Sequence, residues 1–162
     1  MRPRHILAAT SLVFAVLAGF LAAAPARSSD SPFVPVTAAE RSQTRPLVTI
    51  VLAAHRSGDF SSLCAFASER EIREGVGTRA RCRTMARRNP LPPCGRCTFR
   101  ILRVVGVYAT QRDRTERRKT VVWLVGVEND PQFKGESELE LGFFRERGRW
   151  VLSQILQAGS AR

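Results

Sequence analysis

The sequence predicts an α+β protein in which helices come first and a four-stranded antiparallel sheet follows. Three observations predict this class. The region from residue 37 to residue 88 has apolar residues at helical spacing, and a proline-rich stretch ends it. From residue 98 onward, four successive segments are rich in β-branched and aromatic residues. Short turn signals separate these segments, so neighbouring strands are expected to pair as a meander.

The first 26 residues have the pattern of a secretory signal peptide. "MRPRH" supplies positive charge, residues 6–24 carry none, and Ala24-Pro25-Ala26 provides small residues for cleavage. The alternative is an uncleaved membrane anchor, because this apolar stretch reaches the lower end of the roughly 17 to 25 residues that span a bilayer. We expect cleavage, and therefore export.

The rest of the chain is expected to form one domain with short flanking segments. Ser- and Pro-rich residues 27–36 predict a flexible linker. The domain itself is expected at residues 37–157, a length that supports one hydrophobic core. Residues 158–162 are expected to form a disordered tail.

The first helix of the domain has clear end signals and one internal conflict. Thr37 and Glu40 form the pattern of a capping box at its start. Pro46 conflicts with a continuous helix, which either begins at Thr37 and kinks or starts afresh near Thr44. Gly58 is placed to end the helix in the left-handed conformation. The apolar face is expected to comprise Leu47, Val48, Ile50, Val51, Leu52 and Ala54.

Two further helical segments are expected before the prolines. Asp59 is placed to cap the first of them, which would bury Phe60, Leu63, Cys64 and Phe66. The next, at residues 69–88, is strongly polar and contains Gly75 and Gly77. Its residues available to a core are Ile72, Val76, Ala80, Cys82 and Met85.

Strands are expected at residues 99–109, 120–128, 136–147 and 149–156. A charged loop at residues 111–119 joins the first two, and Asn129-Asp130-Pro131 marks the next turn. Gly148 marks a tight turn before the last strand. Glutamates alternate with apolar residues in the third strand, which predicts one wet face.

The four cysteines are expected to form disulfides, because their number is even and the chain is expected to be exported. Of three possible connectivities we favour Cys64 with Cys82 and Cys94 with Cys97. The "CGRC" motif follows prolines and runs into a strand, so no helix start is present to activate a thiolate for redox catalysis. A zinc site would need ligands at metal-binding spacing elsewhere in the chain, and none is evident.

Several of these segments together resemble a known family. The stretch "AAHRSGDFSSLCAFAS", a second cysteine further on in a helix, and the closing "FFRERGRWVLSQI" are similar to the nuclear transport factor two-like superfamily. The resemblance is strongest to its exported actinobacterial members of the SnoaL-like type and covers about residues 44–157. It implies a cone-like fold, in which a curved sheet wraps against helices and encloses an apolar pocket. Members include isomerases, cyclases, dehydratases and non-catalytic binding modules, so the fold alone leaves the activity open.

The resemblance directs attention to three candidate catalytic residues. Isomerase-type members use a tyrosine with acidic residues, and cyclase-type members use a histidine with an aspartate. The corresponding candidates are Asp59, His55 and Tyr108. Helix capping explains Asp59, and His55 is expected at the surface or pocket rim, where its imidazolium would interact with the helix dipole. The expected pocket walls are Trp123, Trp150, Tyr108 and Phe143.

No metal or cofactor is expected. Glu136, Glu138 and Glu140 would lie about 6.5 to 7 Å apart along a strand, too far for tight shared coordination, and are interpreted as a solvated face. The sequence has no Gly-rich phosphate loop and no catalytic G-x-S-x-G or H-E-x-x-H motif.

The formal charge of +12 comes mostly from arginines scattered along the chain. We interpret them as a codon preference, expect no nucleic-acid partner, and allow a weak contact with an anionic cell-envelope surface. The leading hypothesis is an exported, non-catalytic binding or interaction module, monomeric or dimeric, with an unknown apolar ligand or protein partner. The alternatives are a small-pocket isomerase or hydrolase-like enzyme, and a membrane-anchored adaptor if the first helix is not cleaved.

Overall fold

A computed structural model describes residues 33–110 and 117–159 of the chain. The expected signal peptide, most of the charged loop and the last three residues lie outside this range. Within it, helices α2 (Ala38–Ser57), η1 (Ser61–Ala65, a 3₁₀-helix), α3 (Glu69–Gly75) and α4 (Arg79–Arg88) precede strands β1 (Thr98–Thr110), β2 (Arg117–Asp130), β3 (Gly135–Glu146) and β4 (Arg149–Gly159). The predicted α+β class is confirmed. None of the described helices is long and apolar enough to cross a membrane.

The long helix α2 begins where the capping box predicts and continues through Pro46. The Thr37 side chain accepts a hydrogen bond from the Glu40 amide, and Glu40 accepts one from the Thr37 amide. Packing of one face against the sheet compensates for the proline. At the other end Gly58 has a φ of 74°, and a Cβ there would collide with the Leu91 carbonyl.

The segment after α2 differs from the prediction in two ways. Asp59 does accept the Ser61 amide at 2.8 Å, but the element that follows is a 3₁₀-helix whose N-cap is Phe60. The prediction of one helical segment at residues 69–88 is wrong, because α3 and α4 are separate helices, each with its own side-chain cap. Gly77, at a φ of 86°, turns the chain between them. Ala80, expected in the core, is exposed on α4.

The four strands form one antiparallel sheet in the order β1-β2-β3-β4, as expected. Each pair of neighbouring strands has a register shift, at Ile101/Arg103, Glu128/Asp130 and Gly142/Phe143. Such bulges bend strands and increase the twist of the sheet. Strand β4 runs to Gly159, so the prediction of a disordered tail from residue 158 is wrong for its first two residues.

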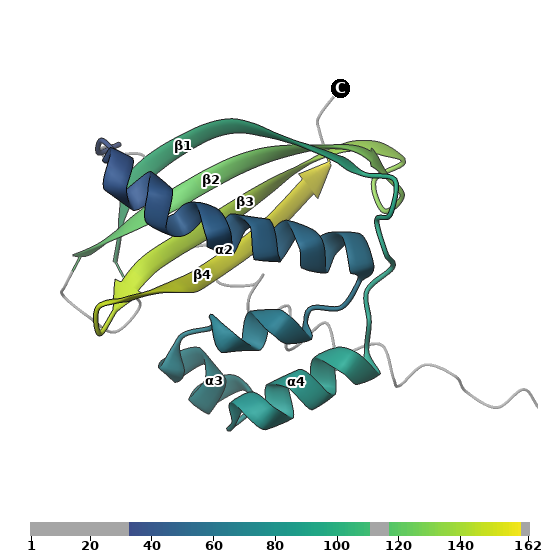
Figure 1. Ribbon diagram of the computed structural model, residues 1–162, viewed down its shortest axis with the longest axis horizontal. Coiled ribbons are helices and arrows are strands. Elements are labelled where there is room, and N and C mark those ends of the chain that lie inside the picture. The colour runs from purple at the N-terminus through teal and green to yellow at the C-terminus, as the bar shows by residue number, and fades with distance from the viewer. Residues whose placement is uncertain (1–32, 111–116, 160–162) are drawn as a thin grey trace, which may run out of the picture.

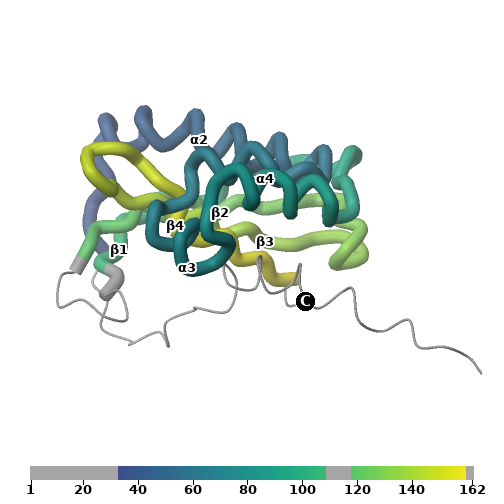
Figure 2. The backbone as a smooth tube through the Cα atoms, turned by 90° about the horizontal axis from the view of Figure 1, so that it is seen from below, coloured from purple at the N-terminus to yellow at the C-terminus, as the bar shows by residue number. Residues whose placement is uncertain are grey.

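Helix α2 lies along one face of the sheet, whereas α3 and α4 lie beyond the β4 edge (Figure 1). The edge-on view in Figure 2 shows α2 as a separate layer over the sheet. Between these layers lies the core, whose largest members are fully buried: Val51, Val121, Val125, Val127, Leu139, Leu141 and Phe143. A smaller cluster under α3 and α4 contains Ile72, Val76 and Met85 around the Cys64 and Cys82 side chains.

The end of the expected linker is structured. Val34 exchanges two backbone hydrogen bonds with Gly106 of β1, of 2.9 and 3.1 Å, and Lys119 donates to the Pro35 carbonyl at 2.9 Å. A proline after Val34 favours extended backbone, which can pair with an open strand edge. The flexible-linker prediction is therefore wrong for this part of residues 27–36.

Both cysteine pairs lie at disulfide-bonding distance in the connectivity that we favoured. The Cα atoms of Cys64 and Cys82 are 5.9 Å apart and link η1 to α4. Those of Cys94 and Cys97 are 5.3 Å apart, directly before β1. Cys94 also donates its amide to the His55 carbonyl, so this second pair holds the start of the sheet against the end of α2.

Candidate functional site

The candidate catalytic residues do not gather in one site. Asp59 is exposed, and hydrogen bonds from Ser61 hold the pKa of its carboxyl below the ordinary value. Tyr108 is 38% exposed on the edge strand β1. His55 is 5% exposed, so the prediction of a surface or rim histidine is wrong. The last turn of α2 faces the sheet at this point, and the ring packs against Phe60 and Phe99.

The expected pocket walls have three different environments. Phe143 is fully buried in the core. Trp123 is 4% exposed, and its indole N–H donates to the Thr44 hydroxyl at 3.0 Å. Trp150 is half-buried at the start of β4, and its indole N–H donates to the Gln43 side chain at 2.8 Å.

His55 belongs to a polar network that the sequence did not reveal. Its Nε2 lies 3.3 Å from the Gln157 Oε1 atom, and the Gln157 Nε2 atom donates to Asp130 at 2.5 Å. Asp130 is 1% exposed and also accepts the Ser137 hydroxyl at 2.6 Å and the Gln132 amide at 2.9 Å. Each carboxylate oxygen therefore has a donor, as a buried carboxylate requires.

The same contacts determine how the imidazole of His55 is oriented. Because the Gln157 amide nitrogen faces Asp130, its oxygen faces His55, and only a protonated Nε2 can donate to that oxygen. Within the described part of the chain, His55 Nδ1 has no hydrogen-bond partner. The network joins the end of α2 to the ends of β2 and β4, so its evident role is to hold these elements together.

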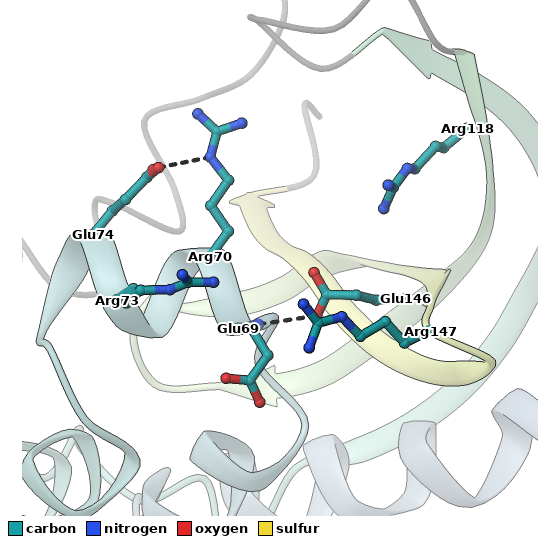
Figure 3. A pocket seen from close by; sticks show the side chains of 7 residues that line it. All are labelled: Glu69, Arg70, Arg73, Glu74, Arg118, Glu146 and Arg147. Carbon is teal, nitrogen blue, oxygen red and sulfur yellow. Dashed lines mark hydrogen bonds and ion pairs between the residues drawn. The ribbon is translucent and has the colours of Figure 1, made fainter.

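An open groove lies at the opposite end of the sheet, between α3, the start of β2 and the β3–β4 turn. Its volume is about 520 Å³. All of the described side chains that line it are charged: Glu69, Arg70, Arg73, Glu74, Arg118, Glu146 and Arg147. Figure 3 shows Arg70 and Arg73 on the α3 side, with Arg118 and Arg147 across the opening. We call this site the arginine groove.

The carboxylates of the arginine groove already have partners. Glu74 pairs with Arg70 at 2.8 Å, and Glu69 pairs at 2.5 Å with Arg79, which lies outside the groove. The Glu146 carboxylate accepts the backbone amide of Glu69 at 3.0 Å. The hydrogen bond and charge of Arg79, with smaller contributions from Arg147 and Arg73, hold the pKa of Glu69 below its ordinary value.

Three guanidinium groups of the groove therefore lack a direct anionic partner among the residues that the structure describes. Across residues 33–110 and 117–159, neither a hydrogen bond nor an ion pair is made by the side chains of Arg73, Arg118 and Arg147. The Arg118 guanidinium lies over the Phe144 ring, 5.6 Å from its centroid. Guanidinium groups stay protonated in proteins, so the groove presents permanent positive charge.

The topology explains why these arginines meet. In an antiparallel meander the first and third hairpin turns lie at the same end of the sheet. Arg118 follows the β1–β2 connection, and Arg147 sits in the β3–β4 turn with a φ of 50°. In the sequence, the charged segments "QRDRTERRK" and "RERGR" were the only indication of this site. Because arginines are scattered along the whole chain, these two segments did not stand out as neighbours.

Glu71 lies beside the groove at the start of α3 and has an unusual acidity. Burial away from water raises the pKa of its carboxyl to about 7; hydrogen bonds from Ser68 oppose the rise, and the Glu146 carboxylate adds to it. The folded pKa lies above the unfolded value of 4.5, so the folded state retains this proton longer than the unfolded state does. The resulting stabilisation is complete below pH 4.5 and is lost as the pH rises through about 7.

We expect ionisation of Glu71 alone to lower the free energy of unfolding by about 2.5 kcal/mol between pH 5 and pH 8. Urea unfolding at a series of pH values, on the wild type and on Glu71→Gln, measures this difference. Glutamine mimics the neutral acid, so its variant should lack that part of the slope. Glu74→Gln, at an exposed position on the same helix, is the matched control. Equal slopes for wild type and Glu71→Gln would contradict the prediction.

The described residues contain no cluster of histidine, cysteine and acidic side chains that could hold a metal ion. The three glutamates of β3 do not form one: Glu140 accepts the Gln154 amide at 2.6 Å, and the other two are exposed. Comparison with protein-family models, curated proteins and solved structures finds no match to this chain. The arginine groove therefore has to be interpreted from its own chemistry.

Proposed function

We propose that this chain is an exported, non-catalytic binding module that holds an anionic group in the arginine groove. The observation that carries the proposal is the set of three guanidinium groups, on Arg73, Arg118 and Arg147, that face one groove without a carboxylate partner among residues 33–110 and 117–159. Guanidinium groups bind carboxylates and phosphates through two parallel hydrogen bonds. A bound anion would also relieve the repulsion among the three.

Export is supported by the cysteines. Both pairs lie at disulfide-bonding distance, which suits an oxidising compartment. Helices packed on a four-stranded antiparallel sheet are also compatible with membership of the nuclear transport factor two-like superfamily, which is part of the proposal.

Binding without catalysis is supported by the placement of the candidate catalytic residues. Asp59 and Tyr108 are exposed on separate segments, and the buried His55 is hydrogen-bonded to Gln157 rather than lining the arginine groove. An apolar ligand inside a cone-like pocket stays a sequence-based prediction. Two of the expected walls of that pocket, Trp123 and Phe143, are packed into the core.

Calorimetric titration with trigalacturonate, a short chain with three carboxylates, tests the proposal. Arg118→Gln and Arg147→Gln should each weaken binding about tenfold, or roughly 1.4 kcal/mol. Arg83→Gln is the matched control, because it removes the same charge from an exposed position on α4 outside the groove. Its affinity should stay within twofold of wild type. An equal loss in all three variants would show that attraction to net charge, and not the groove, binds the ligand.

A further inference from the structure

A second groove adjoins the first at Arg118. It has a volume of about 590 Å³ and is lined by Ala39, Glu40, Gln43, Arg118, Lys119, Arg145 and Trp150. Since Arg118 lines both sites, a ligand anchored on this side chain can extend in either direction. We call the second site the tryptophan groove.

The tryptophan groove is held in place by hydrogen bonds from three elements. The Gln43 Oε1 atom of α2 accepts both the Trp150 indole N–H, at 2.8 Å, and the Arg145 guanidinium, at 2.6 Å. The Arg145 guanidinium also lies over the Trp150 ring, 5.2 Å from its centroid. Nearby, Lys119 pairs with Glu40 at 2.8 Å. Partial burial raises the pKa of the Glu40 carboxyl, but hydrogen bonds from Lys119 and Thr37 outweigh this and hold the pKa below its ordinary value.

The side chains of the two grooves determine what kind of anion fits. Among the described residues, four arginines and three glutamates line the arginine groove, so a ligand there meets both hydrogen-bond donors and acceptors. A densely charged anion would be repelled by the three carboxylates. A chain that carries spaced anionic groups and hydroxyls satisfies both sets, because hydroxyls donate to carboxylates while its anions accept from guanidinium groups.

Trp150 adds a requirement for a ring. A sugar ring presents C–H groups that pack on the flat apolar surface of an indole. The Trp150 N–H is already bound to Gln43 and Arg145 lies over the ring, so a sugar ring would pack on the face away from Arg145. Each groove has a volume in the range of small-ligand pockets, about 300 to 1,000 Å³, so each has room for at least one sugar ring. A flat membrane surface would not enter two hollows, and a peptide made of acidic residues alone carries no hydroxyls.

We infer that an acidic polysaccharide chain occupies both grooves, with its anionic groups on the arginines of the first and a sugar ring against Trp150 in the second. This inference rests on the proposed function and extends it, because it names the ligand class and adds Arg145 and Trp150 to the site. The two grooves then act as one binding track that crosses the end of the sheet from α3 to the start of α2.

The test compares trigalacturonate with polygalacturonate of about ten or more units by calorimetry. Wild type should bind the long chain at least tenfold more tightly per chain. Arg145→Gln and Trp150→Leu should remove most of that gain, whereas Arg118→Gln should weaken both ligands. Urea unfolding of each variant checks that it is folded. If Trp150→Leu does not fold, Arg145→Gln alone tests the second groove. Polyglutamate of equal length, and vesicles of anionic phospholipid, should bind at least tenfold more weakly than polygalacturonate.

The remaining outcomes distinguish a failure of the polysaccharide inference from a failure of the proposed function. Trimer binding that depends on Arg118 and Arg147, without a gain from chain length, would overturn the polysaccharide track and leave the proposed function standing. A length gain that survives both Arg145→Gln and Trp150→Leu would overturn the second groove. Polyglutamate or vesicles that bind as tightly as polygalacturonate would overturn the ligand class. Absence of trimer binding would overturn the proposed function as well.

Discussion

Replacement of Asp130 with alanine is expected to lower the free energy of unfolding by about 4 kcal/mol. The carboxylate is 1% exposed and accepts hydrogen bonds from Ser137, Gln157 and the Gln132 amide. Alanine removes the acceptor and leaves the buried Ser137 hydroxyl and the half-buried Gln157 amide without it, which is more costly than losing both partners of a hydrogen bond. Because Gln157 also orients His55, the end of α2 loses its polar connection to the sheet.

Two variants distinguish this effect from a general cost of removing an aspartate. Asp130→Asn keeps one acceptor oxygen and should lose about half as much stability. Asp59→Ala removes an exposed carboxylate that accepts the Ser61 amide, and should cost below about 1 kcal/mol. Urea unfolding at neutral pH, followed by circular dichroism, measures all three. If Asp59→Ala is as destabilising as Asp130→Ala, the buried network does not have the importance assigned to it.

Removal of the Cys64–Cys82 link, by alanine at both positions, is expected to cost about 3 kcal/mol. The pair joins positions 18 apart in sequence and ties η1 to α4. Closing a loop of this length restricts the unfolded chain, which raises its free energy relative to the folded state. Alanine fits both sites without burying a polar group, since the two side chains are 3% and 7% exposed within the small cluster.

The matched control is removal of the Cys94–Cys97 link, whose positions are only 3 apart. The same loop-closure relation gives about 2 kcal/mol, so the first double variant should be the less stable by about 1 kcal/mol. Urea unfolding without reductant compares the two variants with wild type. A reversed order would mean that Cys94–Cys97 stabilises the protein mainly by holding the sheet against α2, through the Cys94 amide and the His55 carbonyl.

Local signals were sufficient for most of the secondary structure. Gly58 predicted the end of α2, and the Thr37 capping box marks the one of its two predicted starts that the structure has. Successive strand patterns separated by turn signals predicted the meander. The errors occur where tertiary contacts overrule local preference. Val34 pairs with an open strand edge, β4 extends alongside β3 as far as Gly159, and Pro46 is tolerated because α2 packs on the sheet.

The candidate sites were much less predictable. The sequence proposed His55, Asp59 and Tyr108, which the fold places in three separate environments. His55 was expected at the surface because its position near a helix end does not reveal which face meets the sheet. Asp130 was recognised only as part of a turn signal, since its partner Gln157 lies 27 residues away at the end of β4.

The sequence by itself determined the class of fold, the order of its elements and the pairing expected of its cysteines, because each depends on periodicity, turn residues or short spacing. Only the tertiary structure decided which charged groups share a surface. Arg73 comes from α3, Arg118 from β2 and Arg147 from the turn after β3, and each resembles any other arginine of this basic chain. Their convergence follows from strand pairing, which sets the distances between residues far apart in sequence.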